Sequence, residues 1–214
     1  MAVAELFSLD GYYVIGLSKS DKSITFLAEF LQVDFTKETE CLKVINFIKG
    51  KYKKISCIVH CAGVMHSMPA SRVDSKLLTE SFAVNVQFPI LLTSLLTKNL
   101  SRGKASVIFV GSVASDICIN GELVYSSTKS ILKKVTKNFA IELGRLGIKF
   151  FLIKPSICDS PMTSKLSQDD FNYMVSRSVA GKALSCKEVA SQIFQICKSD
   201  TLLNGTVFEC GGSN

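Results

Sequence analysis

A tyrosine and a lysine stand four residues apart in the stretch VYSSTKS, at Tyr125 and Lys129, near the start of a helix-length segment. Residues at positions i and i+4 of a helix project from the same face, so the phenol and the ammonium can lie close together. A nearby ammonium stabilises a phenolate and lowers the phenol pKa from its usual value of about 10. The pair could therefore act as a general acid or base for a carbonyl or an alcohol.

A serine, Ser112 in GSVAS, follows a strand-like apolar run and precedes Tyr125 by thirteen residues. Its hydroxyl could donate a hydrogen bond to the same substrate oxygen and stabilise the charge that develops there. Each motif alone is weak, because YxxxK occurs by chance on exposed helices and a serine after a strand is an ordinary turn residue. The combination of spacing, strand end and helix start favours an active site.

Apolar runs with strand character alternate with helix-length segments along the chain. One such segment, Thr36–Lys49, stops at Gly50, and Ser185 with Glu188 forms a capping box ahead of another. Nearly continuous hydrophobicity is typical of parallel strands buried on both faces. The pattern predicts an α/β fold with a doubly wound, mostly parallel, Rossmann-like sheet and helices on both faces. The predicted strands are Tyr12–Leu17, Phe30–Val33, Ile55–His60, Ser106–Val110, Lys149–Ile153 and Thr206–Cys210.

Length and composition favour one soluble domain over residues 1–214, with 47% hydrophobic and 20% charged residues. We expect neither a membrane span nor a signal peptide, and so a cytoplasmic protein with reduced cysteines. A metal site is not expected, because His60 and His66 are the only histidines and no carboxylate is close in sequence. The net charge of +7 comes from dispersed lysines, which favours a solvated surface over a nucleic-acid site.

At these residues the sequence resembles the short-chain dehydrogenase/reductase family over nearly the whole chain. Ser112, Tyr125 and Lys129, with Asn85 in FAVNVQF, match the family's catalytic tetrad. HCAG stands where the family has its NNAG-like segment, and KPSICDSPMT is similar to its PG-x-x-x-T segment. FECGGSN is similar to the closing strand. The resemblance implies cofactor contacts by Cys61, Ala62, Gly63, Tyr125, Lys129, Pro155, Ser156 and Ser160.

The resemblance also implies roles for two polar side chains of the tetrad. Asn85 would hold a water that links Lys129 to solvent, and Lys129 would hydrogen-bond the nicotinamide ribose. The alternative for Asn85 is a helix polar group bonded to neighbouring backbone. HCAG has an ordinary alternative as well, a tight turn of small residues in which Gly63 gives backbone freedom.

The family's first strand and its TGxxxGxG loop have no counterpart in the sequence, which opens at the helix that follows them. That loop holds the cofactor pyrophosphate through backbone N–H groups, and the first strand is central in the sheet. We expect the neighbouring strands to lack a partner. Two explanations are open, a chain whose true beginning lies upstream of Met1 or a degenerate member without cofactor, and we favour the first.

The cofactor preference is predicted from the end of the second strand of the resembled fold, where GLSKS places Ser18 and Lys19. A cation without an acid favours the 2′-phosphate of NADP over the 2′-hydroxyl of NAD, although Lys19 could equally be an exposed loop residue. Asp34 matches the family's adenine-pocket aspartate, or it caps the helix that starts near Thr36.

The leading hypothesis is hydride transfer between NADP(H) and a carbonyl or secondary alcohol. A 3-oxoacyl thioester, a sugar, a small ketone or a polyketide intermediate would fit as substrate. The segment 163–182 should cover it, with Phe171, Tyr173, Met174 and Val175 as an apolar wall. The alternative is a non-catalytic binding or scaffold protein on a degenerate dehydrogenase fold. Apolar residues spread around the helix after Ser126 imply a homodimer or homotetramer, unless they all face the monomer core.

Overall fold

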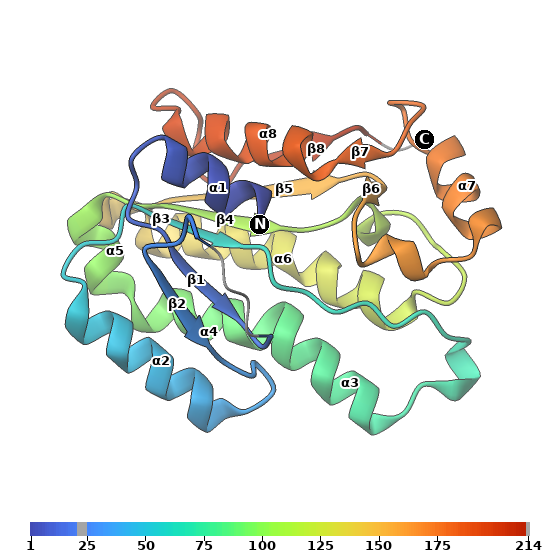
Figure 1. Ribbon diagram of the computed structural model, residues 1–214, viewed down its shortest axis with the longest axis horizontal. Helices are drawn as coiled ribbons and strands as arrows, with labels where there is room; N and C mark the ends of the chain where they lie inside the picture. Colours follow the sequence, from blue (N-terminus) through green and yellow to red (C-terminus); the bar gives the residue numbers. More distant parts are fainter. Residues whose placement is uncertain (21–24, 213–214) are drawn as a thin grey trace.

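The computed structural model describes residues 1–20 and 25–212 of the chain, arranged as parallel strands between layers of helices (Figure 1). The helices are α1 (Ala2–Leu9), α2 (Glu38–Lys51), α3 (Ser75–Phe82), α4 (Phe88–Leu95), α5 (Thr97–Gly103), α6 (Leu123–Leu143), α7 (Gln168–Ser176) and α8 (Cys186–Lys198). The strands are β1 (Ile15–Ser18), β2 (Glu29–Gln32), β3 (Cys57–His60), β4 (Ser106–Val110), β5 (Lys149–Pro155), β6 (Cys158–Asp159), β7 (Leu184–Ser185) and β8 (Val207–Cys210).

The main sheet has four parallel strands in the order β3-β4-β5-β8, and helices link each strand to the next. The strands β1 and β2 form a separate parallel pair, and β6 pairs with β7. Each of the six predicted strands contains or overlaps one of these strands. The prediction of an α/β fold with a mostly parallel sheet and helices on both faces is therefore confirmed.

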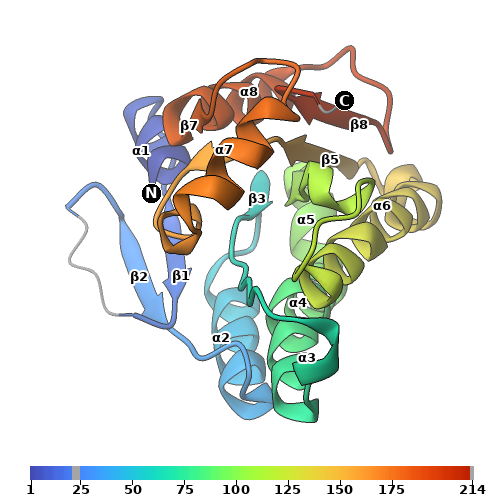
Figure 2. The ribbon, with the colours of Figure 1, turned by 90° about the vertical axis from the view of Figure 1, so that its right-hand side faces the viewer.

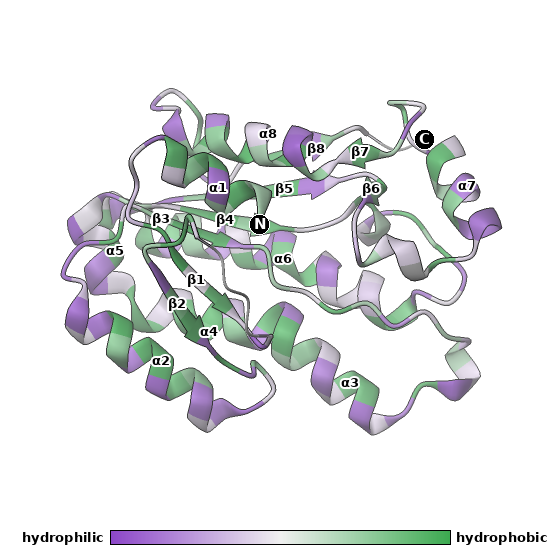
Figure 3. Cartoon of the chain, viewed as in Figure 1, coloured by the Kyte–Doolittle hydropathy of each residue, from purple (hydrophilic) through white to green (hydrophobic). Residues whose placement is uncertain are grey.

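Alternate side chains of the central strands fill two separate cores, as the two-residue period of a strand requires. On β4, Val107 and Phe109 pack toward α2, α4 and α6, whereas Ile108 packs toward α1 and α8. On β5, Phe150 joins the first core and Phe151 the second. Because both faces are covered, these strands are apolar along their whole length, as the hydropathy colouring shows (Figure 3).

The helix predicted over 36–49 is shifted by about half a turn, because α2 spans Glu38–Lys51 and Gly50 lies inside it. The prediction that the helix stops at Gly50 is wrong, and Lys51 provides a cation in the last turn instead. The capping box of Ser185 and Glu188 at the start of α8 is confirmed. Within the described residues, no helix is both long and apolar enough to span a bilayer.

Candidate active site

Tyr125 lies in the first turn of α6, opposite the loop that leaves β4. In that loop Ser112 begins a short 3-10 turn, and its Oγ accepts a hydrogen bond from the Ala114 N–H at 3.2 Å. The Ser112 hydroxyl is also hydrogen-bonded to the phenol of Tyr125. The strand end and the helix start expected from sequence are thus brought together at the carboxyl edge of the main sheet.

Lys129 is buried one turn further along α6, and its Nζ donates a hydrogen bond to the Val110 carbonyl at 2.9 Å. The same nitrogen lies 5.7 Å from the centre of the Tyr125 ring. Burial lowers the pKa of Lys129 to about 8, because desolvation disfavours its charge. The i, i+4 spacing therefore does bring the two side chains to one face of the helix.

The expected depression of the Tyr125 pKa by Lys129 is not found. Burial raises the pKa of Tyr125 to about 12, and its hydrogen bond to Ser112 offsets only part of that rise. The negative charge of a phenolate would be desolvated here, and Lys129 faces the ring while its hydrogen bond goes to Val110. The phenol is consequently protonated at neutral pH in this structure, which suits a proton donor.

Asn85 lies in a π-helical turn, Ala83–Gln87, between α3 and α4. Its amide exchanges two hydrogen bonds of 2.9 Å with the backbone of Val64 and donates a third to Thr128 Oγ1 at 3.0 Å. π-helical turns within helices often occur at functional sites. Asn85 thereby ties the segment after β3 to α6 immediately beside Lys129.

Gly63 closes the gap between these groups. A Cβ atom added to Gly63 would lie 3.4 Å from both Asn85 Oδ1 and Lys129 Nζ, which is a tight contact. Only a residue without a side chain lets the segment after β3 approach the two polar groups this closely. Of the four matched tetrad residues, Ser112 and Tyr125 are hydrogen-bonded, and Asn85 and Lys129 flank Gly63.

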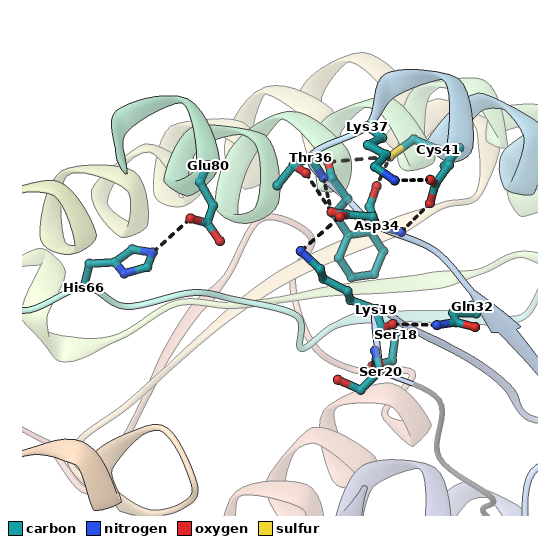
Figure 4. A network of polar contacts seen from close by, with 12 residues as sticks. Ser18, Lys19, Ser20, Gln32, Asp34, Thr36, Lys37, Cys41, His66 and Glu80 are labelled. Atoms are coloured by element: carbon teal, nitrogen blue, oxygen red, sulfur yellow. Dashed lines mark hydrogen bonds and ion pairs between the residues drawn. The ribbon is translucent and has the colours of Figure 1, made fainter. Parts of the chain in front are cut away.

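The residues predicted to select the cofactor meet at the end of β1 (Figure 4). Lys19 Nζ forms an ion pair with Asp34 Oδ2 at 3.0 Å, while 65% of the Lys19 side chain stays exposed. Asp34 Oδ1 also accepts hydrogen bonds from the Thr36 N–H and hydroxyl at 3.1 and 2.7 Å. Hydrogen bonds from Thr36 and then Lys19 lower the pKa of Asp34 to about 2. The helix α2 begins after Lys37, so Asp34 is not its N-cap.

The remaining residues matched to cofactor contacts fall in two places. Ser18, Lys19 and Asp34 line one cavity together with Cys61, Ala62 and Gly63. Ser156 is buried after β5, where Gly211 approaches it so closely that a Cβ on Gly211 would lie 2.2 Å from Ser156 Oγ. Further residues matched to the family segment after β5 are Pro155, at the end of β5, and Ser160, whose Oγ lies 3.1 Å from Thr163 Oγ1.

The predicted substrate wall is met in part. Tyr173 and Met174 of α7 line a small cavity with Val113 and Ile119, beside the loop that carries Ser112. The other two residues predicted for the wall, Phe171 and Val175, do not line this cavity. Within 1–20 and 25–212, no cluster of three or more His, Cys, Asp or Glu side chains could hold a metal ion.

Sequence reasoning missed several residues that hold the site in place. Thr128 anchors Asn85, and no pattern in VYSSTKS distinguishes it from its serine neighbours. His60 is buried, bonds Thr93 Oγ1 at 2.9 Å and stacks on Phe109, and burial lowers its pKa to about 3. Glu122, at the N-cap of α6, is buried, and its Oε2 has no hydrogen-bond partner. The apolar strand and the helix capping signal around these residues gave no indication of either role.

The model of the short chain dehydrogenase family matches residues 15–170. The chain is 24% identical over 217 residues to the 3-oxoacyl-[acyl-carrier-protein] reductase FabG of Buchnera aphidicola, covering 97% of this chain and 89% of that protein. It is 24% identical over 214 residues to the NAD-dependent glycerol dehydrogenase of Listeria innocua, covering 95% and 84%. This chain belongs to the short-chain dehydrogenase/reductase family, and it is an NAD(P)-dependent oxidoreductase of that family.

Solved structures of similar fold agree with this assignment. A short-chain dehydrogenase family protein from Francisella tularensis superposes with a TM-score of 0.85 at 22% identity, covering 97% of this chain and 90% of that one. A blue fluorescent protein from a metagenomic library, in complex with NADPH, superposes with a TM-score of 0.87 at 18% identity, covering 98% and 91%. At these identities the likeness shows the fold alone.

The residues present fit part of a nicotinamide dinucleotide. Lys19 and Asp34 offer charged contacts at one end of the cavity, and Gly63 leaves close access beside Lys129 at the other. The helix α1 has no side-chain cap at its amino end, where an anion is stabilised by N–H groups and the helix dipole. The chain therefore offers contacts for the adenosine and ribose portions, while a glycine-rich pyrophosphate loop is not found among residues 1–20 and 25–212.

Proposed function

We propose that the protein transfers a hydride between NADP(H) and a carbonyl or secondary alcohol, with Tyr125 as the proton donor or acceptor. The observation that carries this proposal is the hydrogen bond between the Tyr125 phenol and Ser112, with Lys129 Nζ 5.7 Å from the same ring. A proton donor, a second hydrogen-bond donor and a buried cation converge on one substrate position, as the reduction of a carbonyl requires.

The bound nicotinamide supplies or accepts the hydride. In the reducing direction, Tyr125 gives its phenolic proton to the substrate oxygen, and its pKa of about 12 keeps that proton in place until it is needed. Ser112 donates a hydrogen bond to the same oxygen and stabilises the developing negative charge. Lys129 has three donor hydrogens, so the bond to Val110 leaves two for a cofactor ribose and for a water.

Asn85 is proposed to hold that water. Its two amide hydrogens are both donated, to the Val64 carbonyl and to Thr128, and Oδ1 accepts one bond from the Val64 N–H. One lone pair of Oδ1 remains, and it lies on the side of Gly63 that Lys129 Nζ also faces. A water between them would return a proton to Tyr125 through Lys129 after each turnover.

For the cofactor, the proposal favours NADP(H) over NAD(H). Lys19 uses one donor on Asp34 and remains mostly exposed, so two hydrogens are left for a 2′-phosphate. The paired Asp34 argues partly the other way, because a carboxylate can accept the 2′-hydroxyl of NAD. Known relatives do not decide the point, since one of them is an NAD-dependent glycerol dehydrogenase and a solved neighbour is in complex with NADPH.

For the substrate, a 3-oxoacyl thioester on an acidic carrier protein is the leading candidate, supported by the net charge of +7 and by the likeness to the reductase FabG. A small ketone or a sugar would place the same oxygen at Tyr125. A scaffold protein without catalysis is the second candidate, and the separation of β1 and β2 from the main sheet favours it.

A titration with NADPH, NADH and buffer alone would test the proposal. We expect NADPH to raise the melting temperature, because a ligand that binds only the native state stabilises it. NADPH oxidation should then depend on an added 3-oxoacyl thioester. A protein whose melting temperature ignores both cofactors at millimolar concentration, and which oxidises neither, would support the scaffold candidate instead.

A further inference from the structure

Two strand edges face each other without pairing. The strand β1 is hydrogen-bonded to β2, and β3 to β4, each pair in parallel register. Among the described residues, no backbone hydrogen bond joins β1 to β3. Each facing edge therefore presents a row of N–H and C=O groups at the regular spacing of a strand. Figure 2 shows the β1 and β2 pair apart from β3 and the rest of the main sheet.

The space between these edges is a cavity of about 910 Å³, which we call the β1–β3 cleft. Its sides are formed by β1 and β3, its roof by α1 and its floor by α4. Most of the lining is apolar, and it includes Phe7, Leu17, Ile58, Val59, Phe88 and Leu92. Apolar walls above and below, with backbone polar groups on two opposite sides, are the surroundings of a central strand in a sheet covered by helices.

The direction of an occupant follows from the two edges. Because β1 and β3 belong to parallel ladders of one family fold, a strand between them satisfies both only if it runs the same way. Such a strand would end at the level of Ser18 and His60, which close β1 and β3. Parallel strands buried on both faces read as continuous Val, Ile and Leu runs, so an apolar sequence is required.

Met1 lies where this strand would end. It lines the β1–β3 cleft and is the N-cap of α1, without a side-chain cap bond. Cys61 directly follows β3; burial raises the pKa of its thiol, and the nearby amino group of Met1 partly offsets that rise. The amino end of α1 is thus at the carboxyl edge of β3, within reach of a short turn (Figure 1).

A small molecule of 910 Å³ would also fill the volume, since ligand pockets reach this size. It would leave most of the two rows of backbone groups unpaired, because those groups repeat every 3.3 Å or so along each edge. A buried N–H or C=O without a partner costs free energy comparable to a lost hydrogen bond. Only another backbone supplies donors and acceptors at that repeat on both sides.

We propose that the β1–β3 cleft accepts an extended apolar strand, parallel to β1 and β3, that continues through a short turn into Met1. The strand joins the β1-β2 pair to the main sheet and makes one continuous six-stranded parallel sheet. It also fixes the distance between Lys19 and Asp34 on one side and Gly63 on the other. This last consequence rests on the proposed function, whereas the docking of the strand does not.

The test uses residues 1–214 alone and with a fused segment ahead of Met1. The segment is a strand of about five Val and Ile residues, matched to the four-residue strands β1 and β3, followed by a short Gly–Ser turn. The control fusion has prolines at alternate strand positions, because proline donates no N–H and breaks a central strand. Circular dichroism checks that both fusions fold, and backbone amide exchange is read at residues 15–18 and 57–60.

We expect the strand fusion to raise the melting temperature by about 5 °C or more over the proline fusion, and to slow amide exchange on β1 and β3 about tenfold. Equal melting temperatures and equal exchange in the two folded fusions would overturn the proposal. Equal protection by the same peptide added free, at micromolar concentration, would overturn the covalent link to Met1. Neither readout involves cofactor or turnover, so a failure here is distinct from a failure of the proposed chemistry.

Discussion

Lys129 Nζ lies 5.7 Å from the centre of the Tyr125 ring and donates its hydrogen bond to the Val110 carbonyl, not to the phenol. Both side chains are desolvated, so the pKa of Tyr125 rises to about 12 and that of Lys129 falls to about 8. At neutral pH the pair is a neutral phenol beside an ammonium. Burial, rather than the attraction between them, sets the protonation states in this structure.

The first prediction is a fall in reduction as Lys129 loses its proton. Reductase kcat/KM should be flat from pH 6 to 7 and decline as pH rises through about 8, while Tyr125, with a pKa of about 12, stays protonated. The measurement is initial-rate NADPH oxidation across pH. In Lys129→Arg, whose guanidinium keeps its charge, the remaining activity should lack this decline.

An independent readout uses stability. The folded pKa of Lys129 is lowered below the ordinary lysine value of 10.5, so its burial penalty is present below about pH 8 and disappears as pH rises toward 10.5. Lys129→Met should therefore gain melting temperature relative to wild type at pH 7, and that gain should shrink by pH 10. A gain that does not change with pH would contradict a titrating, buried Lys129.

The second prediction concerns the phenol. Tyr125→Phe should reduce turnover about 100-fold or more and leave the NADPH dissociation constant within a few-fold, because the hydroxyl carries the proton and the ring only packs. Turnover and cofactor titration are measured on the same preparation. Ser127→Ala, an exposed change on α6 two residues away, serves as the control. Near-normal turnover in the Phe variant would remove Tyr125 from the mechanism.

The fold was predictable because its signals are local. Apolar runs such as Ser106–Val110 locate buried strands, and Ser185 with Glu188 marks the start of α8. The grouping of Ser112 and Tyr125 followed from a general property of parallel sheets, that strand ends meet at one edge. Long-range contacts carry no such signal. The bonds of Asn85 to Val64 and Thr128 join segments 21 and 43 residues apart.

Electrostatics were the least predictable part of the site. The lowered phenol pKa was expected from charge and spacing alone, yet burial decides it, and burial depends on how the segment around Val113 covers α6. The ion pair between Lys19 and Asp34 was missed for a similar reason. The two residues follow different strands, and only the parallel pairing of β1 with β2 brings them within 3.0 Å.

The third prediction concerns cofactor preference. Wild type should prefer NADPH to NADH, and Lys19→Asp should lower that preference about tenfold, because a carboxylate repels the 2′-phosphate and also loses the ion pair with Asp34. The ratio of kcat/KM values for the two cofactors is the measurement. Lys133→Asp, an exposed change of the same charge on α6, should leave the ratio unchanged. Equal or better use of NADH by wild type would refute the preference.

The last prediction concerns assembly, for which the outer face of α6 is the relevant surface. Several of its apolar residues pack on the monomer core, among them Val135 and Phe139, so the alternative of a monomer core accounts for part of the pattern. Ile141 does not, because it is 80% exposed. An exposed isoleucine on a largely apolar helix favours burial against a second copy across a two-fold axis.

Light scattering at micromolar concentration should therefore give the mass of a dimer or tetramer. Ile141→Glu places a charge at the centre of the proposed contact and should shift the mass toward that of the monomer, since an unpaired buried charge is costly. Leu203→Glu is the matched control, because Leu203 is also 80% exposed but lies in the loop before β8. A monomeric wild type would refute the assembly and leave the roles proposed for Tyr125 and Ser112 untouched, since both side chains belong to the same subunit.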